Sequence, residues 1–199
     1  MASKAKGYFK EGEETEARFA SDYRNHIIEK HGCIINSFLE LLEKKKCLKE
    51  ELILENVKRS FKQELITTKI ASFDNNVFAH WDLKLFNEKI DVKGLRKTCR
   101  SENLPDENFH YVELKNVQGN LGWLYGEADV FAFELQHSWM IVQKDLLQEF
   151  IKEKCSNKIK TESPELYKLY TRRERKDVIT LVKSLDLCQI SREIVKKQK

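Results

Sequence analysis

Proline and glycine are scarce in this chain, with 2 and 7 of its 199 residues, whereas Lys, Glu and Leu are abundant. Both scarce residues interrupt helices and the abundant ones favour them, so the composition indicates substantial helix content. The length excludes two ordinary domains but suffices for one domain with a core of its own.

Paired cysteines and long apolar runs are also missing. No C-x-x-C or H-E-x-x-H spacing occurs, which excludes a zinc ribbon and a disulfide framework and favours a reducing, intracellular location, cytoplasmic or nuclear. No run approaches the length of a transmembrane helix, so we expect no membrane partner. Residues 1–8 lack the apolar segment of a signal peptide.

The charge is unevenly distributed. Residues 152–199 contain 14 Lys and Arg against 7 Asp and Glu, although the whole chain has a net charge of only +4. A basic segment beside a near-neutral body suits a polyanion such as nucleic acid, and it equally suits a solvated helix face.

Hydrophobic periodicity predicts one α+β domain, a mixed or antiparallel β-meander flanked by helices. We expect a loose leader over 1–10, helices within 11–68, a sheet core carrying the site over 69–143, and a helical, basic part over 144–199. The expected helices are 13–30, 34–66, 144–155 and one beginning at Asp177. The expected strands are 77–86, 89–96, 109–117, 128–136 and 138–143.

Residues 80–93 predict a β-hairpin that turns at Asn87 and Glu88. With that turn, Asp82 would face Lys93 and Lys84 would face Asp91, all on one face. The other face would be apolar, with Leu83, Leu85, Ile90 and Val92. A three-residue loop would instead separate the two aspartates onto opposite faces.

Two carboxylates a few ångströms apart repel each other and favour a divalent cation. Mg²⁺ or Mn²⁺ needs few protein ligands when phosphate oxygens and water complete its shell. Such an ion activates water for phosphodiester hydrolysis, and a nearby lysine stabilises the transition state.

Asp82 followed by Asp91-x-Lys93 on the next strand resembles the PD-(D/E)XK nuclease superfamily, which has the restriction-endonuclease-like fold. The resemblance implies that Asp82, Asp91 and the carbonyl of Val92 bind the metal and that Lys93 serves the attacking water. It also implies a metal-binding glutamate on the first helix, for which we choose Glu16, with Glu13 as the alternate. Trp81 stands where the family pattern has proline.

A second acid-x-Lys, Glu113 and Lys115, lies in another predicted strand. The working set is therefore either Asp82, Asp91 and Lys93 or Asp91, Glu113 and Lys115. With either set, Glu113 would be a metal ligand. If Glu113 and Lys115 have no catalytic role, we expect them to form cross-strand charge pairs on an exposed strand face.

The segment 116–129 contains a glycine-rich GWLYG run that resembles uncharacterised nuclease-like proteins, many of them from viruses and phages. Trp123 and Tyr125 would stack on bases or belong to the core, and Gln118 would contact substrate or brace the turn. The expected nucleic-acid contacts are Lys84, Gln118, Trp123, Tyr125, Arg172, Arg173, Arg175 and Lys176.

These patterns predict a metal-dependent nuclease, such as an endonuclease, acting on DNA rather than RNA. The alternatives are a ribonuclease and a non-catalytic nucleic-acid-binding or interaction module of the same fold. A homodimer and exonuclease action both stay open.

Overall fold

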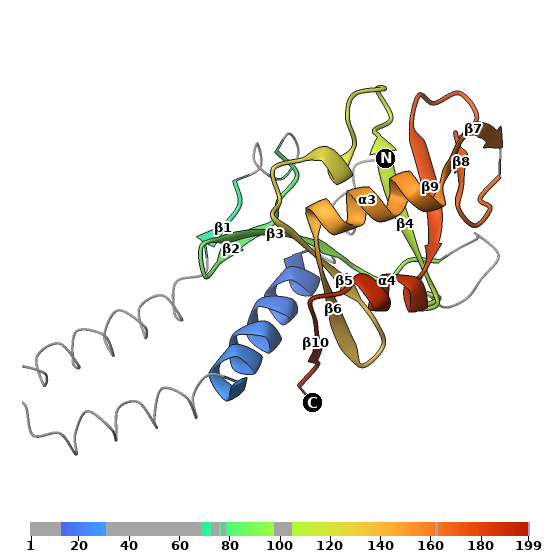
Figure 1. Ribbon diagram of the computed structural model, residues 1–199. Helices are drawn as coiled ribbons and strands as arrows, with labels where there is room; N and C mark the ends of the chain where they lie inside the picture. Colours follow the sequence, from blue (N-terminus) through green and yellow to red (C-terminus); the bar gives the residue numbers. More distant parts are fainter. Residues whose placement is uncertain are drawn as a thin grey trace, which may run out of the picture.

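The computed structural model describes residues 13–30, 69–72, 76, 79–97, 105–161 and 163–198, with the backbone alone for 156–161. The predicted leader 1–10 and the predicted helix 34–66 lie outside these residues. Within them, the predicted α+β fold is confirmed, because helices lie beside two β-sheets (Figure 1).

The larger sheet has six strands and carries both predicted aspartates. Its strands β3 and β5 are parallel, and all its other neighbours are antiparallel. In spatial order they are β1 (Lys69–Ile70), β2 (Leu83–Leu85), β3 (Glu88–Lys93), β5 (Val130–Glu134), β6 (Ser138–Gln143) and β10 (Glu193–Lys196).

The smaller sheet has four strands. Its order is β4 (Phe109–Lys115), β9 (Val178–Lys183), β8 (Lys168–Tyr170) and β7 (Ser156–Thr161). The described helices are 13–30, α3 (Lys144–Lys154), α4 (Ser184–Ile190) and the single 3-10 turn η2 (Trp123–Tyr125).

Apolar side chains cover both faces of the larger sheet. Phe19 and Tyr23 of helix 13–30 pack on one face, against Leu83, Ile90 and residues of β5, β6 and β10. On the other face, alternate residues of β5 and β6 pack against α3, α4, β4 and β9. Figure 1 shows helix 13–30 and α3 on opposite sides of this sheet. A strand buried on both faces is typical of a central position, which β5 occupies.

The predicted hairpin forms, but its turn lies one residue earlier than expected. Phe86 and Asn87 have φ of 51° and 66°, as a type I′ turn requires, and Leu83 pairs with Ile90. Lys84 consequently pairs with Lys89 and not with Asp91. The observed turn leaves Glu88 on the strand, where its carboxylate pairs with Arg192 at 2.6 Å.

Two further expectations about strands and helices are wrong. Strand β4 does not adjoin β3 in a meander, because β5 takes that place and β4 pairs with β9 in the other sheet. Residues from Asp177 onward do not begin a helix but form β9, whose Val178, Ile179, Thr180 and Val182 are β-branched and buried. Helix α4 starts only at Ser184, so the part 144–199 is not wholly helical.

Candidate functional site

Asp82 and Asp91 lie together on one face of the β2–β3 hairpin, as predicted. Leu83 pairs with Ile90. Asp82 directly precedes Leu83 and Asp91 directly follows Ile90, so the two aspartates occupy adjacent positions on the two antiparallel segments. The apolar face that the sequence predicts is also confirmed, because Leu83, Leu85 and Ile90 are buried and Val92 packs against the same cluster.

Asp91 is the most deeply buried acid of this hairpin, with 3% of its surface exposed. Burial raises the pKa of Asp91 well above its ordinary range, the ammonium of Lys93 lowers it, and the carboxyl of Asp82 raises it again. Oδ2 of Asp91 has no hydrogen-bond partner among the described residues. A buried carboxyl oxygen without a partner is unusual, and it is the type of group that a cation or a shared proton satisfies.

Asp82 is held in place by two donors. Its Oδ2 accepts a hydrogen bond from the backbone N–H of Val92 at 2.6 Å, and its Oδ1 accepts one from Nδ2 of Asn76. Asp82 is therefore fixed to β3, one residue beyond Asp91. The sequence implied a role for the carbonyl of Val92, whereas the group that contacts Asp82 is the N–H of Val92.

Lys93 lies between an acid and an aromatic ring. Its Nζ is 2.6 Å from Oδ1 of Asp91 and 4.3 Å from the ring centroid of Trp123, and 23% of its side chain is exposed. The negative face of the indole ring attracts the ammonium and limits its positions. The amine is thus oriented, and part of the Lys93 side chain is exposed.

Glu16 of the first helix approaches this group. Burial raises the pKa of Glu16 to about 7, helped by the charges of Asp82 and Glu13 and opposed by that of Lys93. The helix passes close to the end of β3, where a Cβ on Gly94 would lie 3.5 Å from Cγ2 of Thr15. Glu16 therefore lies within electrostatic range of both Asp82 and Lys93, as chosen from the sequence.

Glu113 reaches the site from the other sheet. Burial raises the pKa of Glu113, and the charges of Lys93 and Arg172 lower it. Lys115, two residues later, is exposed and follows a bulge in the β4–β9 pairing. Glu113 is thus a neighbour of Lys93 on the expected strand, but that strand lies in the other sheet, and Lys115 follows at its exposed end.

The glycine-rich segment 116–126 frames the site, because two of its glycines allow close backbone contacts. A Cβ on Gly122 would lie 2.4 Å from the carbonyl oxygen of Glu113, and one on Gly126 would lie 2.6 Å from Cβ of His80. The segment therefore spans from Glu113 to the residues that precede Asp82, with Trp123 between them.

The predicted base contacts divide into buried and exposed residues. Trp123 is in the core, with its ring centroid 4.8 Å from that of Phe131, so stacking of Trp123 on bases is wrong. Tyr125 is exposed. Gln118 is exposed in a turn, where its N–H donates to Oδ1 of Asn116 at 3.0 Å and its Oε1 accepts from Asn120, so it braces the turn.

The predicted phosphate contacts gather in a turn that precedes β9. Arg172 pairs with the buried carboxylate of Asp177, and Arg175 N–H donates to the carbonyl of Arg172 at 3.0 Å. Arg173, Arg175 and Lys176 are exposed. Lys84, by contrast, is partly buried on the hairpin beside Lys69 and Lys89.

Sequence reasoning missed three contributors to the site: Asn76, His80 and the cation–π role of Trp123. Burial and the charge of Lys93 lower the pKa of His80, whose backbone has a φ of 55°. The sequence gives no signal for the contacts of Asn76 and Trp123, which depend on how separate segments pack.

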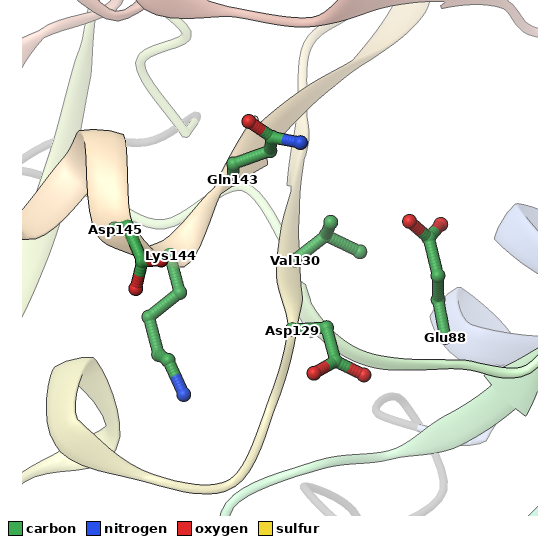
Figure 2. A pocket seen from close by; sticks show the side chains of 6 residues that line it. All are labelled: Glu88, Asp129, Val130, Gln143, Lys144 and Asp145. Carbon is green, nitrogen blue, oxygen red and sulfur yellow. The ribbon is translucent and has the colours of Figure 1, made fainter.

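A shallow depression of about 300 Å³ lies at the other end of β3, lined by Glu88, Asp129, Val130, Gln143, Lys144 and Asp145 (Figure 2). Figure 2 shows its acids on separate segments, and Asp129 accepts a hydrogen bond from the N–H of Lys89. Glu88 begins β3 and Lys93 ends it, so this depression is separate from the acid pair.

No three His, Cys, Asp or Glu residues are grouped to hold a metal ion within the described part of the chain. The helices described there include none that is long and apolar enough to cross a membrane.

Comparison with protein-family models, with curated proteins and with solved structures finds no match for this chain. The family resemblance of its acid pattern therefore stays a prediction.

Proposed function

We propose that this protein is a metal-dependent nuclease in which Asp82 and Asp91 bind Mg²⁺ or Mn²⁺. The observation that carries the proposal is the unpartnered, buried Oδ2 of Asp91 beside the carboxyl of Asp82, with Nζ of Lys93 2.6 Å from Oδ1 of Asp91. Two buried acids and an oriented amine are groups that can hold a metal ion and stabilise the charge that develops in phosphodiester hydrolysis.

The acid pair suits a divalent ion because of its charge balance. Ionising both carboxyls in a buried place is costly, as the raised pKa of Asp91 indicates, and one lysine only partly offsets the cost. Asp82 and Asp91 would supply two ligands, and water and phosphate oxygens suit the remaining positions of Mg²⁺. When bound, the ion would lower the pKa of a water and neutralise charge on the scissile phosphate.

The protein groups have separate roles in this proposal. Asp82, fixed by the N–H of Val92, orients the site relative to β3. Lys93 would help to position the attacking water, or would donate a hydrogen bond to a phosphate oxygen that gains negative charge. Trp123 restricts the ammonium of Lys93 without contacting substrate, since its ring is buried.

The partner that we propose is DNA. Lys93, Arg96 and Arg172 are close enough to Glu113 to lower its pKa, so cations surround the acid group. Phosphate oxygens bind such cations whatever the base sequence, which suits a nuclease and suits RNA as the alternative substrate.

The test incubates supercoiled plasmid, linear duplex, single-stranded DNA and RNA with the protein, with and without Mn²⁺. We expect cleavage only with the ion. Asp91→Asn, which keeps the shape of the side chain, should lower the rate by at least about 100-fold while the protein stays folded. Asp145→Asn is the matched control, because Asp145 is exposed in the separate depression of Figure 2.

Full activity in a cleanly purified Asp82→Ala, Asp91→Ala double variant would contradict the proposal. Nucleic-acid binding without any cleavage by the wild-type protein, and without a response to Mn²⁺, would favour the non-catalytic module instead.

A further inference from the structure

The glycine-rich loop 116–126 contacts the basic turn 172–176 directly. The N–H of Lys176 donates to the carbonyl of Val117 at 3.4 Å. A Cβ on Gly119 would lie 3.2 Å from Cβ of Lys176, and Gly119 has a φ of 89° that suits glycine. The two segments therefore form one surface, which we call the loop–turn surface.

Exposed apolar side chains lie on the loop half of this surface. Leu121 has 63% of its surface exposed, and Val117 and Tyr125 are also exposed. Single exposed apolar residues are common, but three within residues 117–125 of one loop, at the edge of a polar site, are typical of a contact surface.

Cations lie on the turn half. Arg173, Arg175 and Lys176 are exposed, and so is Lys115 at the base of the loop. Two acids accompany them, of which Asp177 is buried and paired with Arg172, while Glu174 is exposed. The surface thus combines positive charge with apolar groups, and this combination is complementary to phosphates and bases together.

The surface leads into the acid pair. Trp123, in the middle of the loop, contacts the ammonium of Lys93, and Arg172 of the turn is near Glu113, which is itself near Lys93. The loop–turn surface is therefore linked to Lys93 through Trp123 and to Glu113 through Arg172.

We propose that the loop–turn surface binds a single-stranded segment of nucleic acid, with Tyr125, Leu121 and Val117 against unpaired bases and the cations on phosphates. This inference rests on the proposed function, because it assigns the substrate strand of that site. A duplex keeps its bases stacked inside and would leave the apolar side chains uncovered, whereas unpaired bases stack on an aromatic ring.

The test measures binding of a fluorescein-labelled oligothymidine of about 15 nucleotides, and of a duplex of equal length, by fluorescence anisotropy in EDTA. We expect tighter binding of the single strand. Tyr125→Ala and Leu121→Ala should each weaken that binding by about tenfold and change duplex binding little. Arg173→Ala should reduce the slope of log K against log salt by about 0.7.

Leu185→Ala is the matched control, because Leu185 is 71% exposed on α4, which follows the other end of β9. Tighter binding of the duplex, or equal effects of Leu121→Ala and Leu185→Ala, would overturn the inference. Because EDTA prevents cleavage, the binding result is independent of catalysis. Selective single-strand binding together with an inactive protein would overturn only the proposed function.

Discussion

The proposed chemistry of this site depends most on one carboxyl oxygen atom, Oδ2 of Asp91. It is buried beside a second carboxyl and has no donor among the described residues, while Oδ1 of the same side chain has Lys93. A proton or a cation satisfies this oxygen, so occupancy by one should compete with the other.

Glu16 gives a prediction about pH. Its pKa is about 7 in the fold and ordinarily 4.5, so between these values the folded chain keeps a proton that the unfolded chain loses. The stability that protonated Glu16 contributes is therefore complete below the ordinary pKa and is lost as pH rises through about 7. We expect Glu16→Gln to resist urea better than the wild-type protein at about pH 8 in EDTA, and to lose this advantage near pH 4.

Glu14→Gln serves as the comparison, because Glu14 is exposed on the same helix. A difference between Glu16→Gln and the wild-type protein that stays constant across this pH range would contradict the electrostatic position assigned to Glu16.

Side-chain alternation is why the central acids could be predicted. Asp82 and Asp91 share a face for any hairpin loop with an even number of residues. The prediction that they lie together is therefore correct, although the predicted turn lies one residue later than the observed turn. The contact of Lys93 with Trp123 could not be predicted, because the two residues lie 30 positions apart and meet only through the packing of separate segments.

At the scale of elements, helix 13–30 is fastened to the last strand of the described chain. Asp22 accepts hydrogen bonds from the indole N–H of Trp139 at 2.8 Å and from the N–H of Gln198 at 3.0 Å. Glu193 of β10 accepts one from His26 at 3.0 Å and pairs with Lys30. The helix that carries Glu16 thus depends on residues near the other end of the chain.

Asp22→Ala should lower the free energy of unfolding by about 2 kcal/mol, because it leaves the buried indole N–H of Trp139 without its acceptor. Urea denaturation measures this loss. The exposed Asp145→Ala should change stability by less than about 0.5 kcal/mol. Similar losses in the two variants would argue against the role assigned to Asp22.

Strands near the C-terminal end were harder to predict than those of the larger sheet. Residues 138–143 alternate between two buried faces and were predicted with the observed bounds. Residues 157–175 are rich in charge and lie in or near β8 and the edge strand β7, and one side of the β7 backbone has no strand neighbour in the described sheet. The run Val178–Lys183 had the apolar spacing of a helix, and pairing with β4 decided for a strand.

At the scale of the molecule, ion binding should stabilise the fold if the acid pair holds a metal. Mn²⁺ about 100-fold above its Kd should raise the Tm by about 5 to 10 °C. Asp91→Asn should abolish this increase while keeping the Tm in EDTA at or above that of the wild-type protein, since it removes the repulsion from Asp82.

Differential scanning fluorimetry measures both quantities, and Asp145→Asn again serves as the control. An undiminished increase of the Tm in Asp91→Asn would mean that the ion binds elsewhere.

The contacts between helix 13–30 and residues in and after β10 also matter for the order in which the chain is synthesised. A ribosome makes this helix early, and makes Glu193 and Gln198, which hold it, some 160 residues later. Until these residues have been made, the nascent chain lacks those anchors for the helix that carries Glu16. The anchoring of this helix is therefore completed only after the β2–β3 hairpin and its acid pair have been synthesised.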